Sequence, residues 1–163
     1  MSDELKSKSS KPTHHPSPIT HHPRTGTVLA FDFGTRRIGV AVGDFETRLA
    51  HPLATLDVAE NRARFAAIER LITEWRPALL VVGLPARADG GEHPVGKLAR
   101  RFAQRLQGRF GVRAELVDEH LTSHDAEHSL RSAGARGARL KAGLDAVAAQ
   151  RILETFFEID DRR

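Results

Sequence analysis

Three short apolar runs, separated by turn residues, open the folded part of the chain. Residues 27–33 (TVLAFDF) are apolar apart from a threonine and one carboxylate, as in a buried strand, and Gly34 follows as a turn residue. In residues 37–44 (RIGVAVGD), bulky side chains alternate with Gly and Ala, so that a helix can approach one face closely. Residues 48–56 (RLAHPLATL) form the third run. Together the runs predict an antiparallel meander of three strands.

The rest of the chain alternates between helical and strand patterns. Apolar residues recur at helical spacing in three places: 61–75, the segment around Leu98, Phe102 and Leu106, and 144–158. A fourth helix is predicted over 122–133, because Thr122 and Asp125 fit a helix start in the manner of a capping box and Gly134 follows its end. Two strands, 78–85 (ALLVVGLP) and 111–119 (GVRAELVDE), lie between these helices. The predicted order is therefore β-β-β-α-β-α-β-α-α. This order is typical of an α/β fold, with a mixed sheet covered by helices.

The first 26 residues differ from everything that follows. They contain four of the eight prolines and no apolar cluster, so they cannot bury enough surface to offset the entropy of ordering them. We expect a disordered tail over residues 1–26 and one domain over residues 27–163. The two histidine pairs of the tail, at 14–15 and 21–22, are more typical of an incidental polar linker than of a transition-metal site.

Composition excludes several classes of function. With no cysteine, the chain has no disulfide, no thiolate nucleophile and no Cys-zinc site, so any metal ion must be held by oxygen or imidazole. No stretch reaches the roughly 18 apolar residues of a membrane span, and the N-terminus has no secretory signal. We therefore expect a cytoplasmic protein with no membrane partner.

The position of the charges says more than the net value of +4. Between Arg87 and Lys141 there are 11 Lys and Arg against 7 Asp and Glu, and most of the bases are arginines. Arginine is suited to bidentate contacts with phosphate. Ordinary solvated helix faces explain the same count equally well.

Carboxylates stand at the ends of two predicted strands and at the start of the last predicted helix. Asp32 is too costly to bury alone, so it needs a cation, hydrogen-bond donors or solvent, unless it caps the turn at Gly34. Asp118 and Glu119 point to opposite faces of their strand, so at most one of them joins Asp32; a solvated strand end is the alternative. Asp145 is equally readable as a helix N-cap.

If these carboxylates come together in the fold, they can hold a divalent cation. Carboxylates that are brought together repel one another unless a divalent cation neutralises them. Mg²⁺ prefers oxygen ligands, and metal ions can stabilise both oxygens of a phosphodiester displacement.

Four ordered motifs carry a resemblance to a known family: FDFGTRRIGVAVGD, VVGLP followed by a DGG turn, VDEHLTS, and LDAVAAQRILETFFE. From Thr27 to Glu158 the chain resembles the YqgF (RuvX) family, described as pre-16S rRNA nucleases and earlier as Holliday junction resolvases. The resemblance implies a ribonuclease H-like fold and a hydrolase of phosphodiester bonds. It also implies that Asp32, Glu119 and Asp145 hold Mg²⁺ or Mn²⁺, which selects Glu119 over Asp118.

Basic residues near these carboxylates are candidate substrate contacts. Thr35, Arg36 and Arg37 follow Asp32 in the family motif, and a polar hairpin turn is their alternative role. The Gly- and Ala-rich segment 132–143 precedes Asp145 and is basic. We expect it to be mobile and to close over a nucleic-acid backbone, although a merely disordered connection is almost as consistent. Its candidate residues are Arg136, Arg139 and Lys141.

Histidines mark one departure from the family and one further alternative. His120 stands where the family usually has arginine, which puts a phosphate contact in doubt. His124 and His128 have the spacing of a transition-metal pair, but an exposed helix face is the favoured interpretation.

The leading hypothesis is a metal-dependent nuclease that processes the 5′ end of precursor 16S ribosomal RNA in ribosome biogenesis. A Holliday junction resolvase and a noncatalytic RNA-binding assembly factor are the alternatives. The DFGT turn also resembles the phosphate-binding turn of actin-like ATPases and sugar kinases. Those enzymes close two such domains around a nucleotide, and 163 residues provide one. The sequence leaves the oligomeric state open.

Overall fold

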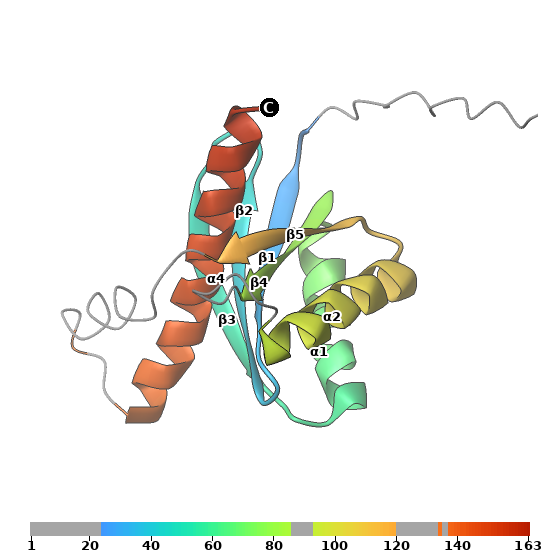
Figure 1. The fold of residues 1–163 in the computed structure, drawn as a ribbon, viewed down its shortest axis with the longest axis vertical. Coiled ribbons are helices and arrows are strands. Elements are labelled where there is room, and N and C mark those ends of the chain that lie inside the picture. The colour runs from blue at the N-terminus through green and yellow to red at the C-terminus, as the bar shows by residue number, and fades with distance from the viewer. Residues whose placement is uncertain (1–23, 86–92, 120–133, 135–136) are drawn as a thin grey trace, which may run out of the picture.

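The computed structural model describes residues 24–85, 93–119, 134 and 137–163 (Figure 1). Its elements are β1 (Thr27–Phe33), β2 (Arg37–Asp44), β3 (Ala50–Asp57), α1 (Asn61–Trp75), β4 (Leu79–Pro85), α2 (Pro94–Phe110), β5 (Ala114–Glu119) and α4 (Gly137–Asp161). They follow the predicted order, and the helix expected over 122–133 lies outside the described residues. None of the described helices is long and apolar enough to cross a membrane.

The five strands form one sheet in the order β3-β2-β1-β4-β5. β1 pairs with β2, and β2 with β3, in antiparallel fashion, whereas β4 is parallel to both β1 and β5. The predicted meander and mixed sheet are thus confirmed. Because β1, β4 and β5 are parallel, their carboxyl ends meet at the same edge of the sheet.

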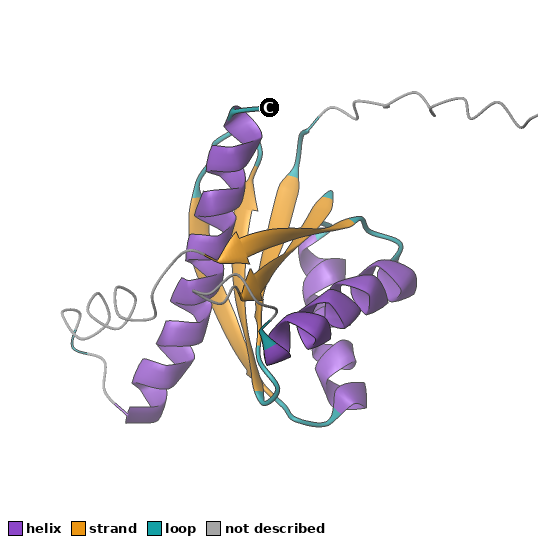
Figure 2. Cartoon of the chain, in the orientation of Figure 1, coloured by secondary structure: helices purple, strands orange, loops and turns teal. Residues whose placement is uncertain are grey.

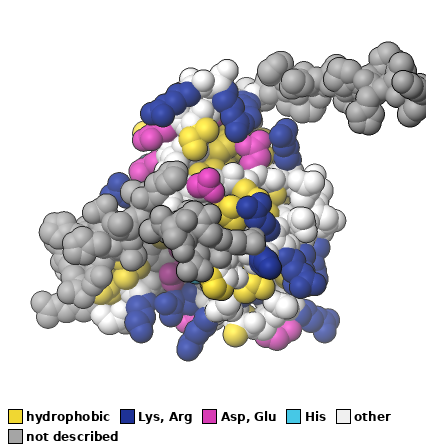
Figure 3. Space-filling model, viewed as in Figure 1, with side chains coloured by type: hydrophobic (Ala, Val, Ile, Leu, Met, Phe, Trp, Pro, Cys, Tyr) yellow, Lys and Arg dark blue, Asp and Glu magenta, His cyan; other side chains and the backbone are white. Residues whose placement is uncertain are grey.

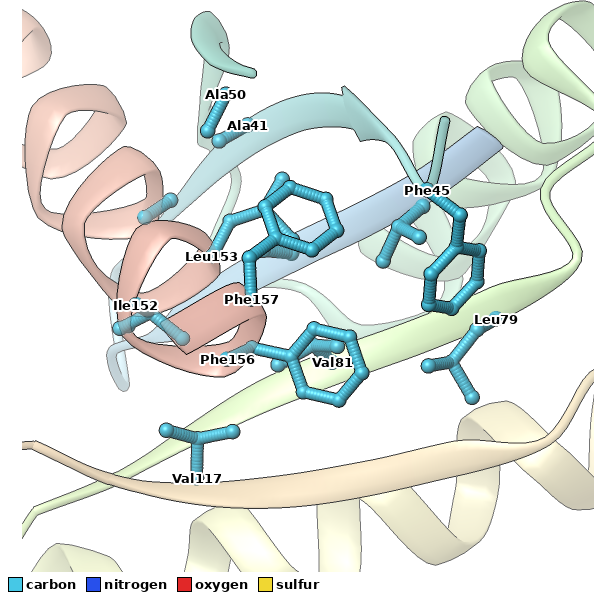
Figure 4. Close-up of a cluster of buried hydrophobic side chains, with 13 residues drawn as sticks. Ala41, Phe45, Ala50, Leu79, Val81, Val117, Ile152, Leu153, Phe156 and Phe157 are labelled. Atoms are coloured by element: carbon cyan, nitrogen blue, oxygen red, sulfur yellow. The ribbon is translucent and has the colours of Figure 1, made fainter. Parts of the chain in front are cut away.

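Helices cover both faces of the sheet, α4 on one face and α1 with α2 on the other (Figure 2). The strand period of two divides β1 between these layers: Val28 and Ala30 face α4, and Leu29 and Phe31 face α1 and α2. On the α4 side, Phe45 packs against the rings of Phe156 and Phe157 at centroid distances of 6.1 Å (Figure 4). β1 and β4 are buried on both faces of the sheet, which explains why their sequences are almost uninterrupted apolar runs.

The ends of α1 agree with the sequence prediction, but the buried face of α2 does not. α1 begins after Glu60, whose side chain accepts hydrogen bonds from two backbone N–H groups, and it ends at Arg76 in the left-handed conformation. On α2, Phe102 and Leu106 are buried as predicted, whereas Leu98 is 42% exposed. Small residues, Gly96 and Ala99, take the place of Leu98 on the buried face and bring α2 close to the sheet.

The last helix begins seven residues earlier than predicted. α4 starts at Gly137, so the segment expected to be a mobile connection contributes its last residues to the helix. Asp145 consequently lies well inside the helix, which excludes its interpretation as an N-cap. Thr55 of β3 donates a hydrogen bond to the carbonyl of Ala142. This contact with the sheet stabilises the first turns of α4, where Gly137 and Gly143 lower the helix propensity.

Two residues of the predicted tail, Arg24 and Gly26, make contacts with the folded domain. Arg24 forms ion pairs with Asp160 of α4 and with Glu115 of β5, the latter at 3.6 Å. Its guanidinium carbon lies 5.8 Å from the centroid of the Phe156 ring. Gly26 continues the hairpin, since its carbonyl accepts a hydrogen bond from the N–H of Phe45 at 3.1 Å. Among the residues that the structure describes, these contacts begin at Arg24, and residues 1–23 lie outside the described part of the chain.

Candidate active site

Asp32 lies near the end of β1, between two glycines on the neighbouring strands. Gly39 of β2 is its partner in the antiparallel register. On the other side β1 pairs with β4 up to Phe31 and Val82, so the next β4 residue, Gly83, follows beside Asp32. Strand glycines of this kind often mark places where another group must approach closely.

The two glycines make room for two other carboxylate-bearing residues. A Cβ atom at Gly39 would overlap the backbone carbonyl of Asp145 on α4. A Cβ atom at Gly83 would overlap the Glu119 carboxylate and the end of the Ile152 side chain. The absence of side chains at these positions lets α4 and Glu119 reach the place where Asp32 stands.

Glu119, not Asp118, is the strand-end carboxylate that joins Asp32. Glu119 is the last residue of β5, in register with Pro85 of β4, and its carboxyl group lies near enough to Asp32 to raise the pKa of Asp32. Asp118 is exposed. The structure brings only Glu119 to Asp32, because the pleat of the strand sends neighbouring side chains to opposite faces.

Asp145 approaches the same place from α4 and is held by an arginine. Nε of Arg37 donates a hydrogen bond to Oδ2 of Asp145 at 2.7 Å. This bond and the negative charge of Asp145 raise the pKa of Arg37. Arg37 follows the turn after Asp32, as the sequence indicated, but its partner in the structure is a carboxylate of the candidate site.

The pKa of Asp32 is affected by its burial and by the two other acids of the site. Burial raises the pKa of Asp32 to about 8, with further contributions from the charge of Glu119, the hydrogen bond between the two carboxyl groups and the charge of Asp145. A nearby positive charge would favour the ionised form of this carboxyl group and lower its pKa. The site is therefore suited to a cation.

The donor set fits a hard divalent cation, and its geometry adds one condition. Oxygen atoms of three carboxylates are ligands that suit Mg²⁺ or Mn²⁺. Among the residues that the structure describes, however, no three His, Asp or Glu side chains are already close enough to hold a metal ion. Asp32 and Glu119 interact with each other, whereas Asp145 binds Arg37 through Oδ2. A three-carboxylate metal site therefore requires these side chains to move closer together.

The remaining predicted contacts on the β1–β2 turn are accessible. Thr35 is exposed, and the side chain of Arg36 is 77% exposed, with Nε 3.6 Å from a carboxylate oxygen of Asp57. An exposed ion pair of this length contributes little to stability. Arg36 is therefore available to another anion.

Arg64, for which the sequence pattern predicted no functional role, holds the β1–β2 turn in place. It is buried in α1, and it donates hydrogen bonds to the carbonyls of Thr35 at 2.7 Å and Val58 at 3.0 Å. Burial lowers its pKa, and its guanidinium carbon lies 5.8 Å from the centroid of the Phe33 ring. The available signal was its position, since an arginine one helical turn before Ile68 interrupts the apolar stripe of α1.

The predicted basic residues before Asp145 are only partly described. Lys141 is exposed on α4, one turn before Asp145. The backbone of Arg139 belongs to α4, but its side chain is not described. Arg136 lies outside the described residues, as do the three histidines at 120, 124 and 128.

Comparisons with known proteins agree on one family and one fold. A family model described as "RuvX: Holliday junction resolvase" matches residues 26–159. Two relatives, both named "Putative pre-16S rRNA nuclease", come from Nitrosomonas eutropha and Chromobacterium violaceum. The first is 53% identical over 134 residues, covering 82% of this chain and 85% of the relative. The second is 58% identical over 131 residues, covering 80% and 96%.

Two solved structures share the fold at low sequence identity. The structure titled "T. thermophilus RuvC in complex with Holliday junction substrate" has a TM-score of 0.53 and 18% identity, covering 84% of this chain and 96% of that one. A fowlpox virus resolvase in complex with Holliday junction DNA has a TM-score of 0.52 and 10% identity, covering 82% and 97%. The predicted ribonuclease H-like fold is confirmed by this similarity.

Proposed function

The chain belongs to the RuvX family and is a nuclease, and on this premise we propose that Asp32, Glu119 and Asp145 are the centre of a metal-dependent cleavage of structured precursor ribosomal RNA. The observation that carries the proposal is the close approach of Glu119 and of α4 at Asp145 to Asp32, for which Gly83 and Gly39 leave room. Burial, and after it the two other carboxylates, raise the pKa of Asp32, and perturbed carboxyl groups of this kind cluster at functional sites.

The three carboxylates share one task in this proposal. Asp32, Glu119 and Asp145 would hold Mg²⁺ or Mn²⁺, and Asp32 would give up its proton to do so. When bound, such an ion activates water and neutralises charge that develops on the phosphate. Arg37 balances the charge of Asp145, and its guanidinium group would also suit a phosphate oxygen.

The β1–β2 turn supplies the nearest proposed contacts to the substrate backbone. Arg64 fixes the carbonyl of Thr35, so the turn is held in one position beside Asp32. Arg36 is exposed at its tip and suits a phosphate contact. Lys141 on α4 would serve the same purpose on the other side of Asp145.

The relatives and the family description point to two substrates. The relatives' name favours precursor 16S rRNA, which would place the activity in the cytoplasm during ribosome assembly. The family description and the solved resolvase complexes favour a four-way DNA junction as the second candidate. We place RNA first because the relatives are 53% and 58% identical to this chain, whereas the resolvase structures are 18% and 10% identical.

The test compares labelled precursor 16S rRNA with a four-way DNA junction, each incubated with Mg²⁺, Mn²⁺ or chelator. We expect RNA cleavage that requires metal, that Glu119→Gln abolishes, and that the control Asp118→Asn retains. Preferential cleavage of the junction would support the second candidate. Binding without cleavage of either substrate would support a noncatalytic assembly factor, and metal-independent cleavage would contradict the proposed site.

A further inference from the structure

Helix α2 carries basic residues and no acidic ones. Its 17 residues, PVGKLARRFAQRLQGRF, include one lysine and four arginines. Four of these five recur at every fourth position, Lys97, Arg101, Arg105 and Arg109, and all four are exposed. Residues four apart lie next to one another on a helix surface, so they form a continuous row, which we call the α2 basic row.

The positive charge of the α2 basic row is not balanced by carboxylates within the described part of the chain. No described carboxylate forms an ion pair with Lys97, Arg101 or Arg105, and the guanidinium of Arg109 lies over the ring of Phe65, 4.2 Å from its centroid. The neighbouring helix α1 is different, because it intersperses Arg62 and Arg70 with two glutamates. Like charges four residues apart destabilise a helix, so the row is an unfavourable arrangement that a polyanion would relieve.

The row begins near the candidate active site and leads away from it. α2 follows β4, whose last residue, Pro85, is in register with Glu119, and it returns the chain to the opposite edge of the sheet where β5 begins (Figure 1). From Lys97 to Arg109 the helix rises about 18 Å. In Figure 3, Lys and Arg side chains gather over the region of α2.

The chemistry of the row favours a phosphate backbone over other partners. Arginine guanidinium groups bind phosphate oxygens in bidentate geometry. Stacking on unpaired bases and docking of a protein both favour exposed aromatic side chains, and the exposed face of α2 has none; its one large exposed apolar residue is Leu98. The row therefore fits a paired nucleic acid that is contacted through its backbone.

We propose that the α2 basic row binds the phosphate backbone of a double-stranded stretch of the RNA substrate, beyond the point of cleavage. This inference rests on the proposed function, because it takes RNA as the substrate. The row contributes affinity and position without reading sequence, since phosphate contacts carry no base information. Its contacts should therefore be strongly dependent on salt.

The test measures binding with the full chain carrying Asp32→Asn, so that no RNA is cut. Arg101→Gln with Arg105→Gln removes two charges from the row, and Arg62→Gln with Arg70→Gln removes the same charge from the exposed face of α1. The probe is a labelled RNA hairpin with a paired stem, titrated by fluorescence anisotropy over a range of salt concentrations. We expect the row variant to lower the slope of log Kd against log salt concentration by about 1 to 2, and the α1 control to leave it unchanged.

Two further arms separate this inference from the proposed function. Equal slopes for the row variant and the α1 control would overturn the inference, as would a loss seen with a four-way DNA junction and not with the RNA hairpin. Cleavage of RNA is measured separately, with the chain that carries no substitution and at saturating protein. Suppose that this protein fails to cut RNA while the row variant still loses salt-dependent RNA binding. The proposed function then fails, and the α2 basic row remains an RNA-binding surface.

Discussion

Arg37, the first residue of β2, holds Asp145 in the middle of α4 through a hydrogen bond of 2.7 Å between Nε and Oδ2. The two residues are 108 positions apart in the chain. The bond places a positive charge beside a site whose other two carboxylates, Asp32 and Glu119, interact with each other. Arg37 is thus a counter-charge of the cluster.

Replacing Arg37 should therefore expose the repulsion among the acids. We expect Arg37→Gln to lower the Tm of the metal-free protein by about 2–6 °C, because a partly buried carboxylate loses its partner. Mg²⁺ or Mn²⁺ should then raise the Tm of this variant more than that of the unchanged protein. Differential scanning fluorimetry with chelator and with millimolar metal measures both effects.

Arg36→Gln is the matched control, because Arg36 is adjacent and makes only a long, exposed contact. Its Tm should stay within about 1 °C of the unchanged protein in both conditions. Identical behaviour of the two variants would show that Arg37 has no special role at Asp145.

The raised pKa of Asp32 predicts a dependence of stability on pH. From the ordinary value of 3.8 up to about 8, the folded state keeps a proton that the unfolded state has released. Stability should therefore fall as pH rises through this interval when no metal is present. Asp32→Asn should remove this dependence and melt at least about 3 °C above the unchanged protein at pH 8, with the difference vanishing near pH 4.

Thermal melts in chelator between pH 4 and pH 9 check this prediction. Parallel curves for the two proteins would mean that Asp32 is ionised in the folded state without metal. Asp118→Asn controls for the loss of a carboxylate nearby, and its curve should follow that of the unchanged protein.

The glycines that flank Asp32 should tolerate no side chain. In Gly39→Ala the new Cβ would overlap the Asp145 carbonyl, so α4 must shift. We expect a loss of about 1–3 kcal/mol in the free energy of unfolding and loss of most cleavage activity. Gly108→Ala in α2 is the control, since a Cβ there meets nothing within 4 Å. It should stabilise the helix by about 0.5–1 kcal/mol. Urea unfolding gives both values, and a harmless Gly39→Ala would refute the close approach of α4.

The N-terminal boundary predicts different results for deletion and for substitution. Deleting residues 1–23 should leave the Tm nearly unchanged, since the sequence of the segment contains no apolar cluster. Arg24→Ala should lower the Tm by several degrees, because the side chain of Asp160 is only 4% exposed and would keep Arg48 alone as its described partner. Both are measured on the purified chain. Equal melting of the deletion and the substitution would contradict this boundary.

The order of the elements was readable from the sequence because it depends on local periods. Alternation along β1 and β2, the apolar spacing of α1 and the pleat at the end of β5 are properties of neighbouring residues. They predicted the meander and limited the partner of Asp32 to one of two acids, and the family resemblance selected Glu119. The ribonuclease H-like fold likewise came from motifs in their order along the chain.

Tertiary contacts decided what these periods could not. The start of α4 at Gly137, the docking of Arg24, the burial of Arg64 and the pairing of Arg37 with Asp145 all join segments that the chain brings together only on folding. An arginine has the same local pattern whether it meets solvent, phosphate or a carboxylate. Its partner is chosen by the space and charge that distant residues create, and at this site two glycines and three acids create them.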